Sequence, residues 1–255
     1  MSLEHGYSID TASWGNRWLT VPAGHKALLA GGLLLCTLLL PPWPAYPLII
    51  AVSLVCTLGL AGIPFRRYVR IVSLPVVFIA VGALPLAFSL SLTDGVRVAF
   101  DPASLQQFVT ASARAATATI ALLTLALTTP TVDLVSSLAR IPRFEPMAEI
   151  ALLIHRFTFI LLTRARSTIE AQAMRLGYST RRATLDSSGM ATSGLLLGAL
   201  ESARAMDEGL VGRGFSGTLA RLEPPRGAHV LFVPASLATL LVVVAVSLLV
   251  STEVL

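Results

Sequence analysis

The chain has 255 residues, of which 55% are hydrophobic and only 13% charged, and its formal net charge is +5. Soluble domains carry about 25% charged residues, so the composition excludes an ordinary soluble domain and predicts a protein covered by lipid. The positive charge does not indicate a nucleic-acid partner, because the arginines gather at the borders of apolar segments and within 164–221, without interleaved aromatic residues.

The N-terminal segment, 1–26, does not resemble a signal peptide. Glu4 and Asp10 stand where basic residues would precede an apolar segment. Arg17 and Lys26 precede the first apolar segment, which we therefore expect to remain as an uncleaved membrane span.

Five segments are expected to cross the membrane, since a hydrocarbon core of about 30 Å takes about 20 helical residues. They are 27–43, 45–63, 71–92, 111–132 and 230–252. Pro41-Pro42-Trp43-Pro44 predicts a tight turn after the first span, and Pro75 and Pro85 predict a kinked or broken third span. Cys36 and Cys56 lie inside apolar segments and are expected to be small buried hydrophobic residues.

The apolar segment 147–162 is not expected to span. It holds Glu149, His155 and Arg156, and each charge at the bilayer centre costs roughly 2.5–3.5 kcal/mol. An amphipathic helix at the interface, or leading out of it, is more favourable. The glycine-rich segment 187–200 is too short to span.

Basic residues predict the orientation. They gather before the first span, between the second and third spans at Arg66, Arg67 and Arg70, and in the link 133–229. We therefore expect the N-terminus inside and the C-terminus outside. The sequence predicts an all-α polytopic membrane protein with a membrane domain of four spans (1–132), a cytosolic module of two long helices (133–229) and a C-terminal span (230–255).

Several kinds of site are not expected. The single lysine, Lys26, is not part of a phosphate-binding loop, so the chain is not expected to bind nucleotide. The four histidines show no metal-ligand spacing. Gly214-Phe215-Ser216-Gly217 resembles the serine motif of intramembrane proteases, but Arg213 and Arg221 flank it and place that serine outside the bilayer.

The polar region 164–217 contains the same pattern twice: Met174-Arg175-Leu176-Gly177-Tyr178-Ser179 and Gly212-Arg213-Gly214-Phe215-Ser216-Gly217. We expect one helix over 146–176, stopped by Gly177, and a second over 188–211, stopped by glycines. A loop with Arg181, Arg182 and Asp186 is expected between them. Each helix then presents one arginine at its C-terminus. The simplest role of such an arginine is to stabilise the helix dipole, by about 0.3–1 kcal/mol.

The segments AQAMRLGY (171–178) and GLVGRGFSG (209–217) resemble the two arginine signatures of the T components of energy-coupling factor (ECF) transporters, in particular the CbiQ branch. The segments VPAGHKALLAGGLLL (21–35), IPFRRYVRIVSLPVVFIAVGALPL (63–86) and RIPRFEPMAEIALLIHRFTFILL (140–162) are also similar to that branch. Met174, Leu176 and Gly212 differ from the small residues or alanine that are commonest beside the signature arginines.

The resemblance implies a non-catalytic subunit of a bacterial cell membrane that couples ATP hydrolysis to uptake of cobalt or nickel. It implies two cytosolic ABC-type ATPases and a separate substrate-binding membrane subunit (a CbiM-like S component) as partners, with no cofactor, metal site or nucleic acid. The implied ATPase-coupling residues are Met174, Arg175 and Leu176 in the first signature and Gly212, Arg213 and Gly214 in the second.

Two other classes remain open. The permease of a conventional ABC importer carries one coupling helix with the pattern E-A-A-x-x-x-G. Glu170-Ala171-Gln172 begins like it, but Gly177 comes one residue late and Arg213 stays unexplained. A membrane enzyme would need an acid–base pair or a metal cluster within or near a span, and the sequence shows neither.

Overall fold

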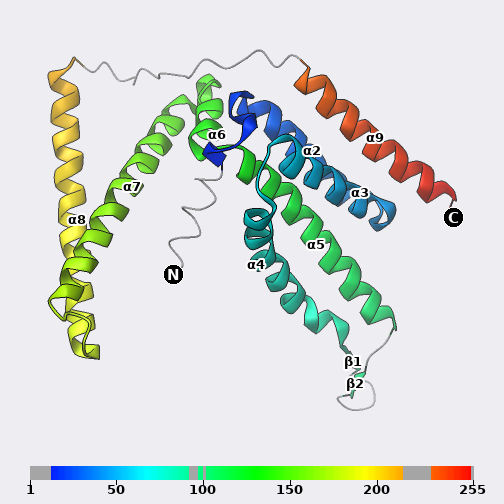
Figure 1. The fold of residues 1–255 in the computed structure, drawn as a ribbon, viewed down its shortest axis with the longest axis horizontal. Helices are drawn as coiled ribbons and strands as arrows, with labels where there is room; N and C mark the ends of the chain where they lie inside the picture. Colours follow the sequence, from blue (N-terminus) through cyan, green and yellow to red (C-terminus); the bar gives the residue numbers. More distant parts are fainter. Residues whose placement is uncertain (1–12, 92–96, 100–101, 215–230, 254–255) are drawn as a thin grey trace. The chain divides into compact units, whose positions relative to one another are not determined.

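The computed structural model describes residues 13–91, 97–99, 102–214 and 231–253 (Figure 1). Nearly all of its regular structure is helical, which confirms the all-α class. Within the described residues the only strands are β1 (Ser89–Ser91) and β2 (Arg97–Ala99), an antiparallel hairpin with Leu90 opposite Val98. Contacts divide the chain into two compact units, one formed by Met1–Ser137 with Pro224–Leu255 and the other by Leu138–Glu223.

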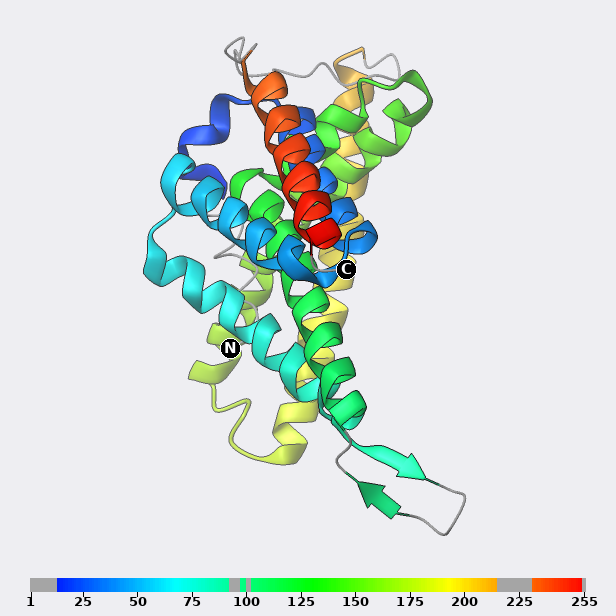
Figure 2. The ribbon, with the colours of Figure 1, turned by 90° about the vertical axis from the view of Figure 1, so that its right-hand side faces the viewer.

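The first unit is a bundle of membrane-type helices. In chain order it contains η1 (Arg17–Thr20), α2 (Ala23–Leu39), α3 (Pro42–Leu54), η2 (Val55–Leu60), α4 (Phe65–Ala83), η3 (Leu84–Ala87), α5 (Pro102–Thr128), most of α6 (Thr131–Leu138) and α9 (Phe232–Glu253). Helix α5 is central and packs against α2, α3 and α4, while α9 packs against α2 and α3 (Figures 1 and 2).

Close packing in this bundle depends on small residues and on hydroxyls that bond within their own helix. A Cβ atom at Gly32 of α2 would collide with the Leu240 side chain of α9, whereas one at Gly31 would meet nothing. The buried hydroxyls of Thr117 and Thr124 donate to the carbonyls one turn earlier, at 2.8 and 3.0 Å. These polar groups therefore lie inside an apolar bundle without an unsatisfied donor.

The start of α2 and the end of α5 meet in a buried polar contact. Lys26 is only 2% exposed, and its Nζ donates to the Thr128 carbonyl at 3.0 Å. Asn16 Nδ2 donates to the same carbonyl at 3.0 Å. A cation is favoured at a helix C-terminus, where carbonyls lack helical partners. Lys26 is thus a buried structural group of this bundle and not only a charge at the border of a span.

Among the described residues, five helices are long and apolar enough to cross a membrane, which equals the expected number although the set differs by one helix. They are Pro42–Leu60, Phe65–Ala87, Pro102–Thr128, Pro142–Met174 and Phe232–Ser251. Three match expected spans closely, and Pro102–Thr128 replaces 111–132 because it begins nine residues earlier and ends before Pro130. Helix α2 has 17 residues, fewer than the roughly 20 that a span needs. By length and composition alone α7 could also span a membrane. Its expected place outside the hydrocarbon core of the bilayer therefore rests on its charged residues.

Helix α4 differs from expectation in two places. It begins at Phe65, so Arg66, Arg67 and Arg70 lie on its first turns and not in a link. It is also continuous through Pro75, and the change to a 3-10 turn comes at Leu84–Ala87. Proline removes one backbone donor, but the helix persists around it when neighbouring bonds hold.

The second unit is a helical hairpin that follows η4 (Pro142–Phe144). Its two long helices are α7 (Glu145–Met174) and α8 (Arg181–Gly212). Helix α8 begins seven residues earlier than expected, so Arg181, Arg182 and Asp186 are helical and not a loop. The reason is the Thr180 N-cap, whose side chain accepts a hydrogen bond from the Ala183 N–H at 3.2 Å.

Candidate coupling site

The first signature arginine follows the last residue of α7. Helix α7 ends at Met174, and Arg175 has φ −95° and ψ 18°. Leu176 then takes a positive φ of 58°. The left-handed residue is therefore Leu176, and the expected stop at Gly177 was wrong in its detail. A leucine in this conformation costs roughly 1–2 kcal/mol, and such strain persists where the surrounding structure requires it.

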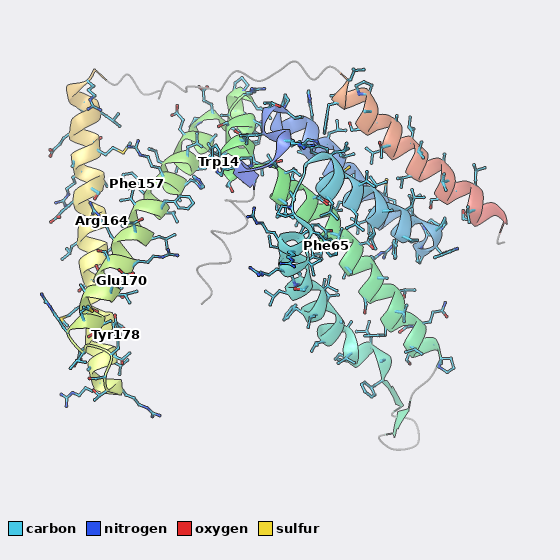
Figure 3. The ribbon with its side chains drawn as sticks, in the orientation of Figure 1. Trp14, Phe65, Phe157, Arg164, Glu170 and Tyr178 are labelled. Carbon is cyan, nitrogen blue, oxygen red and sulfur yellow. The ribbon has the colours of Figure 1, made fainter. Side chains whose placement is uncertain are left out.

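Gly177 is needed for close packing. A Cβ atom there would lie 2.5 Å from Ser187 Oγ and 3.0 Å from the Gln172 carbonyl. The Gly177 N–H donates to that carbonyl at 2.9 Å, and Ser187 Oγ donates to the Gly177 carbonyl at 2.9 Å. Tyr178, seen at the hairpin turn in Figure 3, donates from its hydroxyl to Gln172 Oε1 at 2.9 Å. These hydrogen bonds fix the hairpin turn to both α7 and α8.

The second signature arginine repeats this backbone. Helix α8 ends at Gly212, Arg213 has φ −97° and ψ 8°, and Gly214 has a positive φ of 72°. Each arginine is therefore the first residue beyond its helix and is followed directly by a left-handed residue. Phe215, Ser216 and Gly217 of the expected motif lie outside the described residues, and so does the link 218–229.

The six site residues fall into two separate groups, because α7 and α8 form a hairpin. Met174, Arg175 and Leu176 lie at the turn, whereas Gly212, Arg213 and Gly214 lie at the far end of α8 (Figure 1). Helix α8 has 32 residues, which at about 1.5 Å per residue separates the two groups by roughly 48 Å. Both arginines are exposed.

The turn presents large apolar side chains on either side of its arginine. Met174 is 88% exposed and Leu176 is 73% exposed. The α8 end has no side chains at the matching positions, since both are glycine. Met174 and Leu176 thus form an exposed apolar surface beside a strained backbone.

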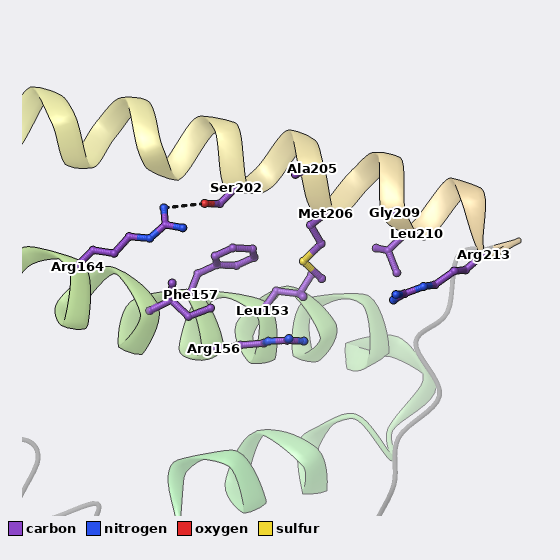
Figure 4. Close-up of a pocket in the computed structure, with 11 residues that line it drawn as sticks. Leu153, Arg156, Phe157, Arg164, Ser202, Ala205, Met206, Gly209, Leu210 and Arg213 are labelled. Carbon is purple, nitrogen blue, oxygen red and sulfur yellow. Dashed lines mark hydrogen bonds between the residues drawn. The ribbon is translucent and has the colours of Figure 1, made fainter.

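The middle of the hairpin is closed by Arg164 of α7. Its guanidinium donates to the Gly198 carbonyl at 3.2 Å and to Ser202 Oγ at 3.0 Å, both on α8 (Figure 4). Small residues allow this approach: Ser187 and Ala191 of α8 are buried, and a Cβ atom at Gly198 would lie 3.4 Å from the Arg164 guanidinium. The glycine-rich segment 187–200 therefore serves helix packing.

Beyond Arg164 the two helices enclose a groove of about 600 Å³. Its apolar lining includes Leu153 and Phe157 of α7 and Met206 and Leu210 of α8 (Figure 4). Among the described residues that line it are also three arginines, Arg156, Arg164 and Arg213, and no acidic residue. Arg156 of α7 and Arg213 beyond the end of α8 both line this groove.

Arg156 is a candidate site residue that the sequence reasoning missed. It was considered only as a charge that argues against a span. The available signal was its spacing: Arg156 and Arg164 lie eight residues apart, which places both near one face of a helix. Its proximity to Arg213 comes from the hairpin, which no local pattern contains.

Other kinds of chemistry find little support in the described part of the chain. Within it, no three His, Cys, Asp or Glu side chains come together as a metal-binding group. Cys36 and Cys56 are buried free thiols, as predicted.

The helices of the first unit, with their lipid-type composition, define a multi-pass membrane protein. The family profile described as the CbiQ cobalt transport protein matches residues 15–225. A cobalt transport protein CbiQ of Rhodobacter capsulatus is 34% identical over 212 residues, which cover 83% of this chain and 86% of that protein. One from Salmonella typhimurium is 33% identical over 183 residues, 67% of this chain and 80% of that protein.

A third relative, a fused cobalt transport protein CbiMQ of Methanocorpusculum labreanum, is 29% identical over 202 residues, 74% of this chain and 33% of that protein. The profile match and the two CbiQ relatives span most of the chain. This chain therefore belongs to the CbiQ family of cobalt transport proteins, as the two arginine signatures suggested.

Proposed function

We propose that this chain is the T component of an energy-coupling factor importer. It joins two cytosolic ABC-type ATPases to a separate substrate-binding membrane subunit, and so couples ATP hydrolysis to uptake of cobalt or nickel. The observation that carries the proposal is the repeated helix end. Arg175 and Arg213 share one backbone geometry but lie roughly 48 Å apart along a single hairpin. Groups so far apart cannot serve one groove, and they match two separate partners.

Each arginine is suited to a carboxylate on its ATPase. Its planar guanidinium can donate two parallel hydrogen bonds to a carboxylate, which lysine cannot. At the first C-terminal end, Met174 and Leu176 would be covered when the ATPase closes around Arg175. Excluding water from a charged pair strengthens it and makes the loss of either partner costly.

The hairpin is built to transmit force as one body. Arg164 joins the middle of α7 to α8, and Ser187 joins the start of α8 to the turn. Helix α7 continues from α5 through α6 and η4 with few residues between them. In this proposal, movement of the ATPases at the helix ends is passed along the chain to α5, the central helix of the membrane bundle.

We place the hairpin and the N-terminus in the cytoplasm and the C-terminus outside. The buried bond from Lys26 to Thr128 and the bond from the Arg17 N–H to the Ala61 carbonyl hold the N-terminal segment, the end of η2 and the end of α5 at one end of the bundle. Arg66, Arg67 and Arg70 start α4 near the same end. Such an excess of bases faces the cytoplasm. An alkaline phosphatase reporter fused after Leu255 should be active, and activity of a cytoplasmic reporter at that position would contradict this orientation.

A CbiM-like protein is the proposed membrane partner. The fused relative CbiMQ joins that kind of protein to a CbiQ segment in one chain, which is expected when two proteins work side by side. Cobalt is the proposed substrate because the relatives are named for its transport.

Purification from native membranes tests the proposal. An affinity-tagged chain should bring down two ATPase chains and one further membrane protein, and the purified chain alone should bind neither nucleotide nor cobalt. ATPases without a further membrane protein would indicate a conventional permease. Neither partner, together with turnover of a small molecule, would indicate an enzyme.

A further inference from the structure

A second polar site lies in the first unit, around Arg114 of α5. Its Nε donates to the Tyr46 hydroxyl at 3.1 Å, and a terminal nitrogen donates to the Leu38 carbonyl at 3.1 Å. The side chain lines an open hollow of about 700 Å³ and is itself exposed. The sequence had placed Arg114 at the end of a span, but α5 begins at Pro102 and carries it three turns into the helix.

The hollow lies at the level of the turn between α2 and α3. Leu38 is in the last turn of α2, and Pro42 begins α3. In the same turn Trp43 is 68% exposed. Exposed tryptophans concentrate at the boundary between hydrocarbon and headgroups, so this turn marks the headgroup level. With this turn at the headgroup level, the Arg114 guanidinium, which donates to the Leu38 carbonyl there, would lie at the depth of lipid phosphates.

The guanidinium has capacity left for an anion. Arginine carries five N–H donors, and the two bonds to Leu38 and Tyr46 leave others free to face the hollow. None of the described residues that line the hollow is acidic. An arginine at a membrane boundary is stable when an anion or water meets its remaining donors.

The rest of the lining is divided in the way a phospholipid is. Gln107 and Thr110 lie on α5 one to two turns before Arg114; the Gln107 amide is a polar group of the lining, while the Thr110 hydroxyl donates to the Gln106 carbonyl at 2.8 Å. Leu38, Leu86 and the alanines at 111, 115 and 118 offer apolar surface. A partner carboxylate would account for the arginine alone, whereas a phospholipid accounts for the charge and for the mixed polar and apolar lining together.

We propose that this hollow binds one phospholipid, with its phosphate on the Arg114 guanidinium. The lipid phosphate would then be held by the same side chain that joins the end of α2, the start of α3 and the middle of α5. The site is separate from the helix hairpin, so its failure would leave the coupling proposal untouched.

Native mass spectrometry of the purified chain tests this proposal. Dioleoyl phosphatidylglycerol is titrated into the detergent-solubilised protein, with dioleoylglycerol as the matched lipid that lacks the phosphate. We expect one retained phosphatidylglycerol per chain and no retained dioleoylglycerol. Arg114→Gln should lower the retained fraction by about tenfold or more, because a charge-assisted bond is lost. Arg70→Gln, which removes the same charge from an exposed position of α4, should leave it within about twofold.

Because Arg114 also holds Leu38 and Tyr46, a second variant protects the test from misfolding. Ala111→Trp fills the hollow and leaves both guanidinium bonds in place, and it too should abolish retention at an unchanged unfolding temperature. Equal retention by the parent, Arg114→Gln and Ala111→Trp would overturn the proposal. Unchanged lipid retention with loss of a co-purified membrane protein in Arg114→Gln would also overturn it, and would assign the arginine to a protein carboxylate.

Discussion

The two arginine-bearing helix ends have the same backbone but different surroundings. At both ends the arginine leaves its helix with φ near −96° and a left-handed residue follows. At the first end that residue is an exposed leucine, and a methionine precedes the arginine. At the second end both neighbours are glycines, and the arginine shares a groove with Arg156.

The comparison shows which features of the two helix ends are shared and which are not. The backbone conformation at each arginine and the left-handed residue after it are common to both ends. In the proposed coupling role, the neighbours would decide how each partner is met: by apolar contact area around Arg175, and by close backbone approach beside Arg213, whose neighbours are glycines. The two partner contacts are therefore expected to respond to different mutations.

Removing either arginine should have the largest effect. Arg175→Ala or Arg213→Ala leaves a partner carboxylate unpaired, which costs roughly 2–5 kcal/mol of ATPase binding. The double change should nearly abolish binding and uptake. Affinity of the purified ATPases for the chain in nanodiscs measures this. Arg204→Ala, an exposed position between the two ends on α8, is the control and should change binding by about 0–1 kcal/mol. Parent-like binding by both single variants would refute the two-ended coupling model.

The apolar side chains should matter at the first end only. Leu176→Ala removes a side chain whose burial against the ATPase contributes about 1.5–3 kcal/mol. Combined with Arg213→Ala it should abolish binding, because it weakens the contact that remains. Leu196→Ala is the matched control, since that leucine is 63% exposed in the middle of α8. If both leucine variants lower ATPase affinity equally, the apolar contact is not specific to the turn.

Substitutions that change backbone strain should have opposite effects on the stability of the two helix ends. Gly214→Ala places a side chain at a positive φ and should destabilise the end of α8 by about 1–2 kcal/mol. Leu176→Gly should stabilise the end of α7 by about 1 kcal/mol for the same reason. Hydrogen exchange of the last-turn amides reports both changes. Gly212→Ala, a helical position with open space around it, should instead slow exchange in α8.

The smallest effect is expected from Arg156. Arg156→Gln removes one of the three arginine charges of the groove and should weaken ATPase binding by roughly 1 kcal/mol. A double-mutant cycle on ATPase affinity is the informative measurement. The loss should shrink when Arg213 is already alanine and persist in full when Arg175 is alanine. If the loss of ATPase affinity from Arg156→Gln adds fully to that from Arg213→Ala as well as to that from Arg175→Ala, Arg156 is not part of the Arg213 contact.

Features that depend on neighbours in the chain could be predicted from the sequence. Apolar length predicted four of the five described helices that qualify as spans, but not α7, and the repeated arginine signatures predicted two helix ends and the family. Helix boundaries were less certain. Thr180 is a readable N-cap, yet the polar residues after it resemble a loop. Gly177 is predicted as the stop of the first helix because glycine usually follows a helix end, whereas the left-handed residue is Leu176.

The remaining features needed the tertiary structure, because they join residues far apart in the chain. Lys26 is buried only because the end of α5 lies beside it, 102 positions away. Arg156 and Arg213 share a groove only because α7 and α8 pair, and the hollow at Arg114 exists only where the turn from α2 to α3 meets α5. Hydropathy and helix signals are local sums over neighbouring residues, whereas these sites depend on which helices pack together.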